Sequence, residues 1–191
     1  MNLPNSLTLF RVLLIPVFIM TLSTSIPFNL PLADRALIAA AIFFVASVTD
    51  WLDGYVARLT GQITKLGKLF DPIADKLLTS SALILLVSLD GQAPAWMAIA
   101  IIGRDVAVTG LRAAASSEGY VIPAYEGGKA KMLFLIIAII ALLLDLNPEY
   151  SYLNAYLIGT VALWMALALS VGSGIQYFAN FWDKIGLREA K

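Results

Sequence analysis

The chain has 191 residues, of which 60% are hydrophobic, and it carries no net formal charge at pH 7. Soluble domains are usually about 45–50% apolar, so this composition places the chain among membrane proteins. Cysteine and histidine are absent from the sequence, which excludes disulfides, thiolate catalysis, zinc–thiolate sites and histidine bases, and with balanced charge we expect no nucleic-acid partner.

Six stretches are apolar enough to predict membrane-spanning helices, each of which needs about 20 residues to cross the hydrocarbon. They lie near residues 8–26, 36–57, 69–89, 94–115, 132–147 and 153–176. The fifth stretch is short, and the side chains of Lys129 and Lys131 would have to snorkel to the interface to lengthen it. We therefore predict an all-α, polytopic membrane protein with six transmembrane helices, folded as a single domain over residues 1–191.

The first predicted span overlaps the sequence LPNSLTLFR, which begins at residue 3. This start lacks a positively charged region and a small-residue cleavage site, so we expect it to be retained rather than removed as a signal peptide. We predict a short N-terminal interfacial helix here, capped by Asn5 or Ser6. Asn5, Thr8 and Arg11 are three residues apart and share roughly one side of that helix.

The end of the second span begins an acidic stretch, DWLDGYVARLTGQITKLGKLFDPIADK, at residues 50–76. It carries four aspartates where the apolar pattern predicts membrane helices. Asp50, Asp53, Gly54 and Ala57 fall at positions i, i+3, i+4 and i+7 of a helix. Two carboxylates and two small side chains therefore share one helical face.

After a turn near Gly61, the third predicted helix presents Gly67, Asp71 and Asp75, which are spaced by four and also share a face. Consecutive antiparallel helices can turn the two acidic faces toward each other. A carboxylate within a membrane costs roughly 2.5–3.5 kcal/mol on insertion scales, and neighbouring carboxylates repel. Divalent cations would offset this cost, because carboxylates suit Mg²⁺ or Mn²⁺ and four of them can hold two ions that clamp a transferring phosphoryl group.

Other interpretations of the acidic stretch stay open at this point. The aspartates could form structural salt bridges with Arg58, Lys65, Lys68 and Lys76, or they could line a proton or cation path in a transporter. The small residues could serve helix packing alone.

The fourth and fifth predicted spans supply a basic cluster. Arg104 and Arg112 are eight residues apart, about two turns, and so lie on similar faces. With Lys129 and Lys131 they are compatible with one pocket for a phosphorylated ligand, which favours Arg and Lys. Alternatively, Arg104 pairs with Asp105 and the lysines are topological anchors.

Positive charges are concentrated on one side of the predicted membrane. Lys and Arg occur between spans two and three, between spans four and five, and at the C-terminus, whereas the opposite segments carry only Arg35. The positive-inside rule then predicts that both termini are cytoplasmic, in agreement with an even number of spans.

The acidic stretch as a whole resembles the signature of the CDP-alcohol phosphatidyltransferases, with every position present. In this sequence the signature reads Asp50-x2-Asp53-Gly54-x2-Ala57-Arg58-x8-Gly67-x3-Asp71-x3-Asp75. The stretches NLPNSLTLFRVLLIPVFI, FDPIADKLL, IIGRDVAVTGLR and GGKAK are similar to the bacterial phosphatidylglycerophosphate synthases within that family. Together with the six-span pattern, the resemblance covers nearly the whole chain.

This resemblance implies a six-helix enzyme of the cell (inner or plasma) membrane, usually a homodimer, with its active site open to the cytoplasm. A hydroxyl of the acceptor would attack the β-phosphorus of CDP-diacylglycerol, and CMP would leave. The bacterial stretches favour sn-glycerol 3-phosphate as the acceptor and phosphatidylglycerophosphate as the product. Inositol phosphate, phosphatidylglycerol and serine stay open as alternative acceptors, and a cation or proton transporter is a more distant alternative.

The resemblance also assigns roles to individual residues. The implied ligands of two divalent ions, Mg²⁺ or Mn²⁺, are Asp50, Asp53, Asp71 and Asp75, and Asp75 is also the favoured general base. The implied contacts to CDP-diacylglycerol are Asp53, Gly54, Ala57, Arg58 and Gly67, joined by Asn5, Thr8 and Arg11 unless these three form only an interfacial anchor. The residues expected to bind glycerol phosphate are Arg104, Arg112, Lys129 and Lys131.

Overall fold

The computed structural model describes the backbone of residues 3–23, 29–60, 65–89, 91–117 and 126–189. It describes the side chains of residues 9–23, 29–52, 73–89, 91–117, 128–150 and 153–182.

Every regular element in these ranges is helical. In chain order they are α1 (Leu3–Leu22), α2 (Leu32–Thr60), α3 (Lys65–Ser88), α4 (Ala95–Ser117), α5 (Glu126–Asp145), the 3-10 helix η1 (Pro148–Leu153) and α6 (Ala155–Glu189). Each predicted span overlaps one α-helix, so the all-α prediction is confirmed.

The predicted short N-terminal interfacial helix is not a separate element, because residues 3–22 form one continuous helix. Pro4 lies in the first turn, where the missing N–H needs no partner. Between residues 5 and 15 the sequence holds no proline or glycine that would end the helix. The prediction was wrong because it divided a stretch that has no local reason to break.

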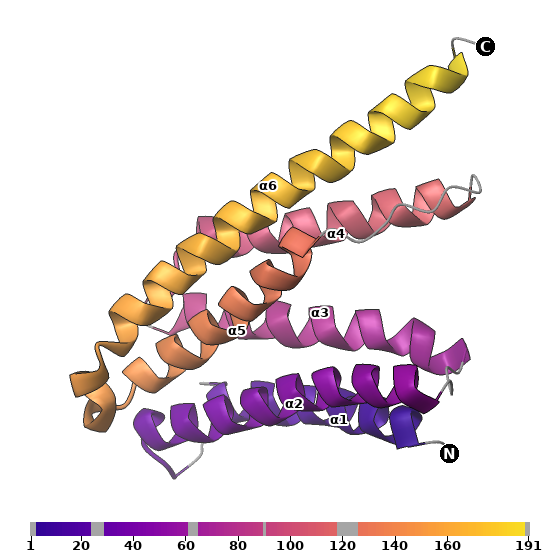
Figure 1. Ribbon diagram of the computed structural model, residues 1–191. Helices are drawn as coiled ribbons and strands as arrows, with labels where there is room; N and C mark the ends of the chain where they lie inside the picture. Colours follow the sequence, from indigo (N-terminus) through magenta and orange to yellow (C-terminus); the bar gives the residue numbers. More distant parts are fainter. Residues whose placement is uncertain (1–2, 24–28, 61–64, 90, 118–125, 190–191) are drawn as a thin grey trace.

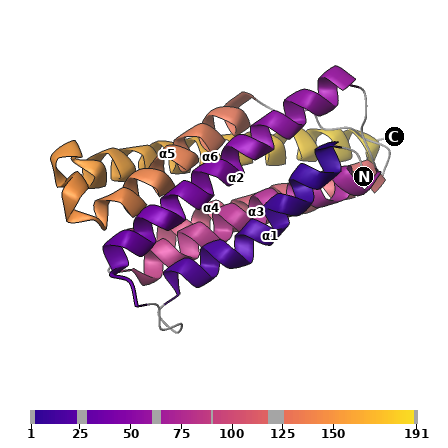
Figure 2. The same cartoon turned by 90° about the horizontal axis from the view of Figure 1, so that it is seen from below.

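The helices form a bundle that is closed at one end and spread at the other (Figure 1). α5 contacts α6, α2 and α3, while α1 packs on α2 and α3, and α4 packs on α6 and α3. The helices diverge toward the end where α1 begins and α6 ends, and both views place these two termini at that same end (Figures 1 and 2). This spread end is called the open end below.

A large apolar core joins the six helices in the closed part of the bundle. Phe18, Phe43, Leu86, Ile101 and Leu142 are among its fully buried members. α5 and α6 approach closely there, because a Cβ added at Gly159 of α6 would lie 2.7 Å from Leu142 Cγ of α5. Small residues allow such close helix contacts.

A second, smaller apolar cluster joins α4 to α6 nearer the open end. Its buried members are Val108, Ala115 and Tyr177, with Leu111 and Phe181 packed against them. Tyr177 of this cluster also contacts Arg104 of α4, which belongs to the candidate site described below.

Arg35, the basic residue that departs from the charge asymmetry, has a local structural role at the closed end. Its Nε donates to the carbonyl of Thr21 at 2.8 Å, and its Nη2 donates to the carbonyl of Ser23 at 2.7 Å. These bonds satisfy carbonyl groups at the C-terminus of α1, which otherwise lack helical partners. The positive charge at this position therefore has a reason unrelated to topology.

The helices expose much apolar surface. Among the described residues, the segments Leu32–Leu52 and Ala155–Trp182 are long and apolar enough to cross a membrane, and Leu9–Leu22 is a shorter apolar stretch. Large apolar side chains are exposed on every α-helix, for example Leu13, Phe44, Ile84, Ile99, Leu133 and Leu157. So many exposed large apolar side chains are typical of a surface that contacts lipid or another protein.

Candidate functional site

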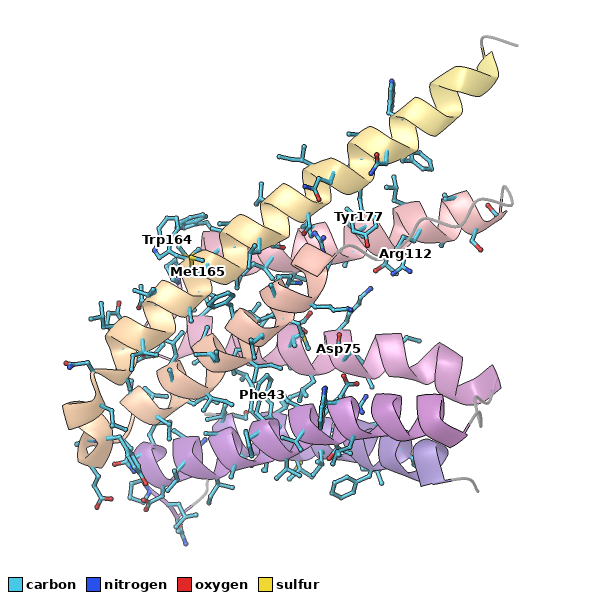
Figure 3. All side chains as sticks on the ribbon, in the orientation of Figure 1. Phe43, Asp75, Arg112, Trp164, Met165 and Tyr177 are labelled. Carbon is cyan, nitrogen blue, oxygen red and sulfur yellow. The ribbon has the colours of Figure 1, made fainter. Side chains whose placement is uncertain are left out.

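Charged side chains from five helices gather within the bundle. They are Arg11 of α1, Asp50 of α2, Asp75 of α3, Asp105 of α4 and Lys131 of α5. The carboxyl group of Asp75 is close enough to interact electrostatically with the other four. Figure 3 shows Asp75 on α3, and Arg112 and Tyr177 on the helices across the spread part of the bundle.

The backbone of the acidic stretch is helical, as the predicted spacing requires. α2 continues to Thr60 and α3 begins at Lys65, so each group of aspartates lies along one face of a helix. Asp50 and Asp75, one from each helix, are half-buried and interact electrostatically. The side chains of the remaining motif positions lie outside the described residues, and their roles stay predictions: Asp53, Gly54, Ala57, Arg58, Gly67 and Asp71.

Arg11 is buried inside the bundle. Its side chain is 0% exposed, and its Nη1 lies 2.5 Å from Oδ1 of Asp50, whose side chain is 40% exposed. A buried guanidinium requires an acidic partner, and a close ion pair restricts the orientation of both groups. Arg11 lies on the inner face of α1, which packs on α2, so its side chain points into the bundle. The side chains of Asn5 and Thr8 lie outside the described residues.

Asp105 links two of the predicted phosphate-binding residues. Its Oδ1 accepts a hydrogen bond from Arg104 Nη1 at 2.9 Å, and its Oδ2 forms an ion pair with Lys131 Nζ. The Lys131 side chain is 7% exposed, so it does not snorkel to an interface as expected from the sequence. These three side chains, two cations and one carboxylate, together carry one net positive charge.

Arg104 is also held by α6. Its Nη2 donates to Ser173 Oγ at 2.7 Å, and its guanidinium carbon lies 5.8 Å from the centre of the Tyr177 ring. The predicted alternative, that Arg104 pairs with Asp105, is therefore observed, but as one contact among several. Arg104 and Lys131 are brought together by the fold, as the pocket prediction requires.

The other predicted basic residues differ in their surroundings. Lys76 of α3 donates to Thr109 Oγ1 of α4, so this lysine links two helices, and it also interacts electrostatically with Asp75 and Asp105. Arg112 and Lys129 are exposed, and no hydrogen bond or ion pair is found for either within the described part of the chain. Both side chains are available to a ligand.

Comparison with known proteins places the chain in a family. The family model for CDP-alcohol phosphatidyltransferase matches residues 1–172. The chain belongs to this family.

Curated relatives match the CDP-alcohol phosphatidyltransferase chain over nearly its whole length. The CDP-diacylglycerol–glycerol-3-phosphate 3-phosphatidyltransferase of Bacillus subtilis (strain 168) is 44% identical over 192 residues, which cover 96% of this chain and 97% of the relative. The proteins of the same name from Pseudomonas fluorescens and Haemophilus influenzae (strain ATCC 51907 / DSM 11121 / KW20 / Rd) are 37% and 38% identical. They cover 100% and 92% of this chain, and 97% and 91% of their own lengths.

Three residues of this CDP-alcohol phosphatidyltransferase contact the basic cluster but were not expected as site residues. Asp105 could have been identified from its charge, since an ionisable side chain in an apolar helix is a functional candidate by default. Ser173 and Tyr177 gave no comparable signal, because serine and tyrosine are common in apolar helices as packing residues. Their contacts to Arg104 depend on how α4 and α6 pack.

The described acids are compatible with a divalent cation. Asp50 and Asp75 offer hard oxygen donors from two helices, and their mutual repulsion would be relieved by a cation between them. No group of three acidic side chains able to hold a metal occurs among the side chains that the structure describes. The other two expected ligands, Asp53 and Asp71, fall outside those residues, so the ion site stays a prediction.

Proposed function

We propose that this protein transfers the phosphatidyl group of CDP-diacylglycerol to sn-glycerol 3-phosphate, giving phosphatidylglycerophosphate and CMP. The observation that carries this proposal is the 37–44% identity, over 92–100% of the chain, to relatives named for this activity. The complete acidic signature on two helices supports it. The product would enter phosphatidylglycerol and other anionic phospholipid synthesis.

In the proposed reaction, a hydroxyl oxygen of glycerol 3-phosphate forms a bond to the β-phosphorus of the donor. The bond between that phosphorus and the bridging oxygen breaks, and CMP leaves with the electron pair. Asp75 is the proposed base that accepts the hydroxyl proton. Its support is its place among charged groups from four other helices, where a polar substrate would find partners.

We propose that Asp50, Asp53, Asp71 and Asp75 hold two ions of Mg²⁺ or Mn²⁺. When bound, such ions would supply positive charge to the diphosphate of the donor. In this proposal the role of Arg11 differs from the expected contact with the donor phosphates. Arg11 orients the carboxylate of Asp50 through their ion pair. The 0% exposure of Arg11 supports this revision.

The donor would lie along the small side chains of the signature. Its proposed contacts on α2 and α3 are Asp53, Gly54, Ala57, Arg58 and Gly67. Asn5 and Thr8 of α1 are proposed to join them, because both belong to the helix whose inner face carries Arg11 toward Asp50. Small residues leave room for a flat ligand to approach the backbone.

The phosphate of the acceptor would bind to Arg104, Arg112, Lys129 and Lys131. A phosphate monoester carries a charge of about −1.5 to −2 at pH 7, so it needs several cations. Arg104 and Lys131 already converge on one carboxylate, while Arg112 and Lys129 are exposed and free to move. This arrangement favours a phosphorylated acceptor over a neutral alcohol.

We further propose that all six helices cross the cell membrane, that both termini and the active site face the cytoplasm, and that the protein is a homodimer. Each α-helix has at least 20 residues, enough to span about 30 Å. Exposed apolar side chains on every helix, and the two termini at one end of the bundle, support the six-span topology. Arg35, the one basic residue on the predicted outer side, is explained by its hydrogen bonds to carbonyl groups at the end of α1, so it does not argue against this orientation.

A direct test measures CMP release by the full-length protein, purified in detergent, from CDP-diacylglycerol and Mg²⁺. The acceptors to compare are glycerol 3-phosphate, inositol phosphate, serine and phosphatidylglycerol. We expect release with glycerol 3-phosphate well above the rest. Faster release with another acceptor would overturn the acceptor assignment, and ion flux in proteoliposomes without any CMP would overturn the enzymatic proposal.

A further inference from the structure

Three residues within one turn of α6 surround the side chain of Arg104: Ser173, Gly174 and Tyr177. Ser173 Oγ accepts the hydrogen bond from Nη2 at 2.7 Å, and the ring of Tyr177 lies 5.8 Å from the guanidinium carbon. Between them, Gly174 leaves space: a Cβ added there would lie 3.0 Å from Arg104 Cγ and 3.4 Å from Nε. Ser173, Gly174 and Tyr177 are called the α6 cradle.

The cradle determines where the guanidinium can lie. An arginine side chain has several rotatable bonds, and each contact that restricts it lowers the entropy lost when a ligand binds. The cradle holds Nη2, the stem and one face of the guanidinium, while Nη1 is directed to Asp105 beside Lys131. The orientation of the Ser173 hydroxyl is itself fixed, because its Oγ donates a hydrogen bond to the carbonyl of Leu169 at 2.5 Å.

We propose that Ser173, Gly174 and Tyr177 are positioning residues for the phosphate of the acceptor, acting through Arg104. This inference rests on the proposed function, and in particular on Arg104 as a ligand of that phosphate. Residues of the cradle do not touch the reacting atoms. They set the affinity for a phosphorylated acceptor and leave the donor site unaffected.

The test compares Gly174→Ala with Gly172→Ala, because a Cβ at Gly172 would meet no atom within 4 Å. Both changes raise the helix propensity of α6 equally, so a difference between them reports the contact with Arg104. A Cβ at position 174 forces Arg104 to shift by a few tenths of an ångström. Partial loss of its charged hydrogen bond to the phosphate should raise the KM for glycerol 3-phosphate by roughly three- to tenfold. The KM for CDP-diacylglycerol and the kcat should stay within about twofold of the wild type, and the inhibition constant of inorganic phosphate should rise with the acceptor KM.

A double-mutant cycle shows whether the effect passes through Arg104. In an Arg104→Ala background, Gly174→Ala should have no further effect on the acceptor KM. Tyr177→Leu, which removes the aromatic face, should raise that KM, whereas Tyr177→Phe should preserve it.

Two results would overturn the inference while leaving the proposed function intact. One is a Gly174→Ala enzyme with the same acceptor KM as Gly172→Ala. The other is an equal effect of Gly174→Ala in the presence and absence of Arg104. Lack of CMP release by the wild-type protein with glycerol 3-phosphate would instead reject the proposed function itself.

Discussion

Replacing Asp105 by asparagine should destabilise the protein by leaving Lys131 charged and buried without its acidic partner. The Lys131 side chain is 7% exposed and that of Asp105 is 18% exposed, so solvent can compensate for little of the loss. Removing one member of a buried ion pair costs about 3–5 kcal/mol. Because asparagine keeps the volume and one acceptor oxygen, we expect about 3 kcal/mol, at the lower end of that range.

The same reasoning predicts that a second substitution repairs the first. Lys131→Met removes the uncompensated charge and keeps an apolar stem of similar length, so Asp105→Asn/Lys131→Met should be more stable than Asp105→Asn alone. The free energy of unfolding is measured by denaturant titration of the protein in detergent. Asp34→Asn, which changes an exposed acid at the start of α2, is the control and should cost less than about 1 kcal/mol.

Two outcomes would refute this account of the network. One is an Asp105→Asn variant as stable as the control variant, which would mean that Lys131 does not depend on Asp105. The other is a double variant in which the costs of the two substitutions add, which would mean that the two groups do not interact.

Three further predictions follow from the site and the packing. Asp75→Asn should lower kcat for CMP release by about 10²–10⁴-fold with the fold intact, and a loss below tenfold would remove Asp75 as the base. Arg112→Ala and Lys129→Ala should change the free energy of unfolding by no more than about 0.5 kcal/mol, since both residues are exposed. Each should nevertheless raise the KM for glycerol 3-phosphate, and unchanged KM values would exclude both residues from the pocket. Gly159→Ala should lower the free energy of unfolding by about 1–3 kcal/mol, because its Cβ would lie 2.7 Å from Leu142 Cγ across the α5–α6 contact. Gly103→Ala is the control and should not lower it, because a Cβ there would meet no atom within 4 Å. Equal unfolding free energies of the two variants would contradict the close packing.

Features with a local cause could be predicted from the sequence. The six helices follow from apolar stretches of sufficient length, and the two acidic faces follow from the spacing of aspartates on a 3.6-residue helix. Both depend only on residues close together in the chain. The family resemblance has the same basis, because the signature from Asp50 to Asp75 is a short run of fixed spacings.

Contacts between helices could not be predicted in this way. Arg11 meets Asp50, Lys131 meets Asp105 and Arg104 meets Ser173, although 26 to 69 positions separate the last two pairs. Each contact depends on the rotation of a helix about its own axis and on the partner that it packs against. Sequence periodicity identifies which residues share a face, but it does not identify which face of the next helix they meet.

The burial of two charged side chains could not be predicted for a related reason. Arg11 and Lys131 lie near the ends of predicted apolar stretches, where the usual expectation is an interfacial or snorkelling side chain. In the fold both turn inward, because Asp50 and Asp105 provide acidic partners there. A buried cation was predictable only once its acid was known.

The central claim is that the acids of α2 and α3 hold divalent ions that act on the donor. It is tested most directly by titrating the purified protein with Mn²⁺ in the presence of CDP-diacylglycerol and measuring the free ion by electron paramagnetic resonance. We predict roughly two ions bound per wild-type chain, and weaker or fewer ions for Asp50→Asn and Asp75→Asn. Identical Mn²⁺ binding by the wild type and both variants would contradict the account.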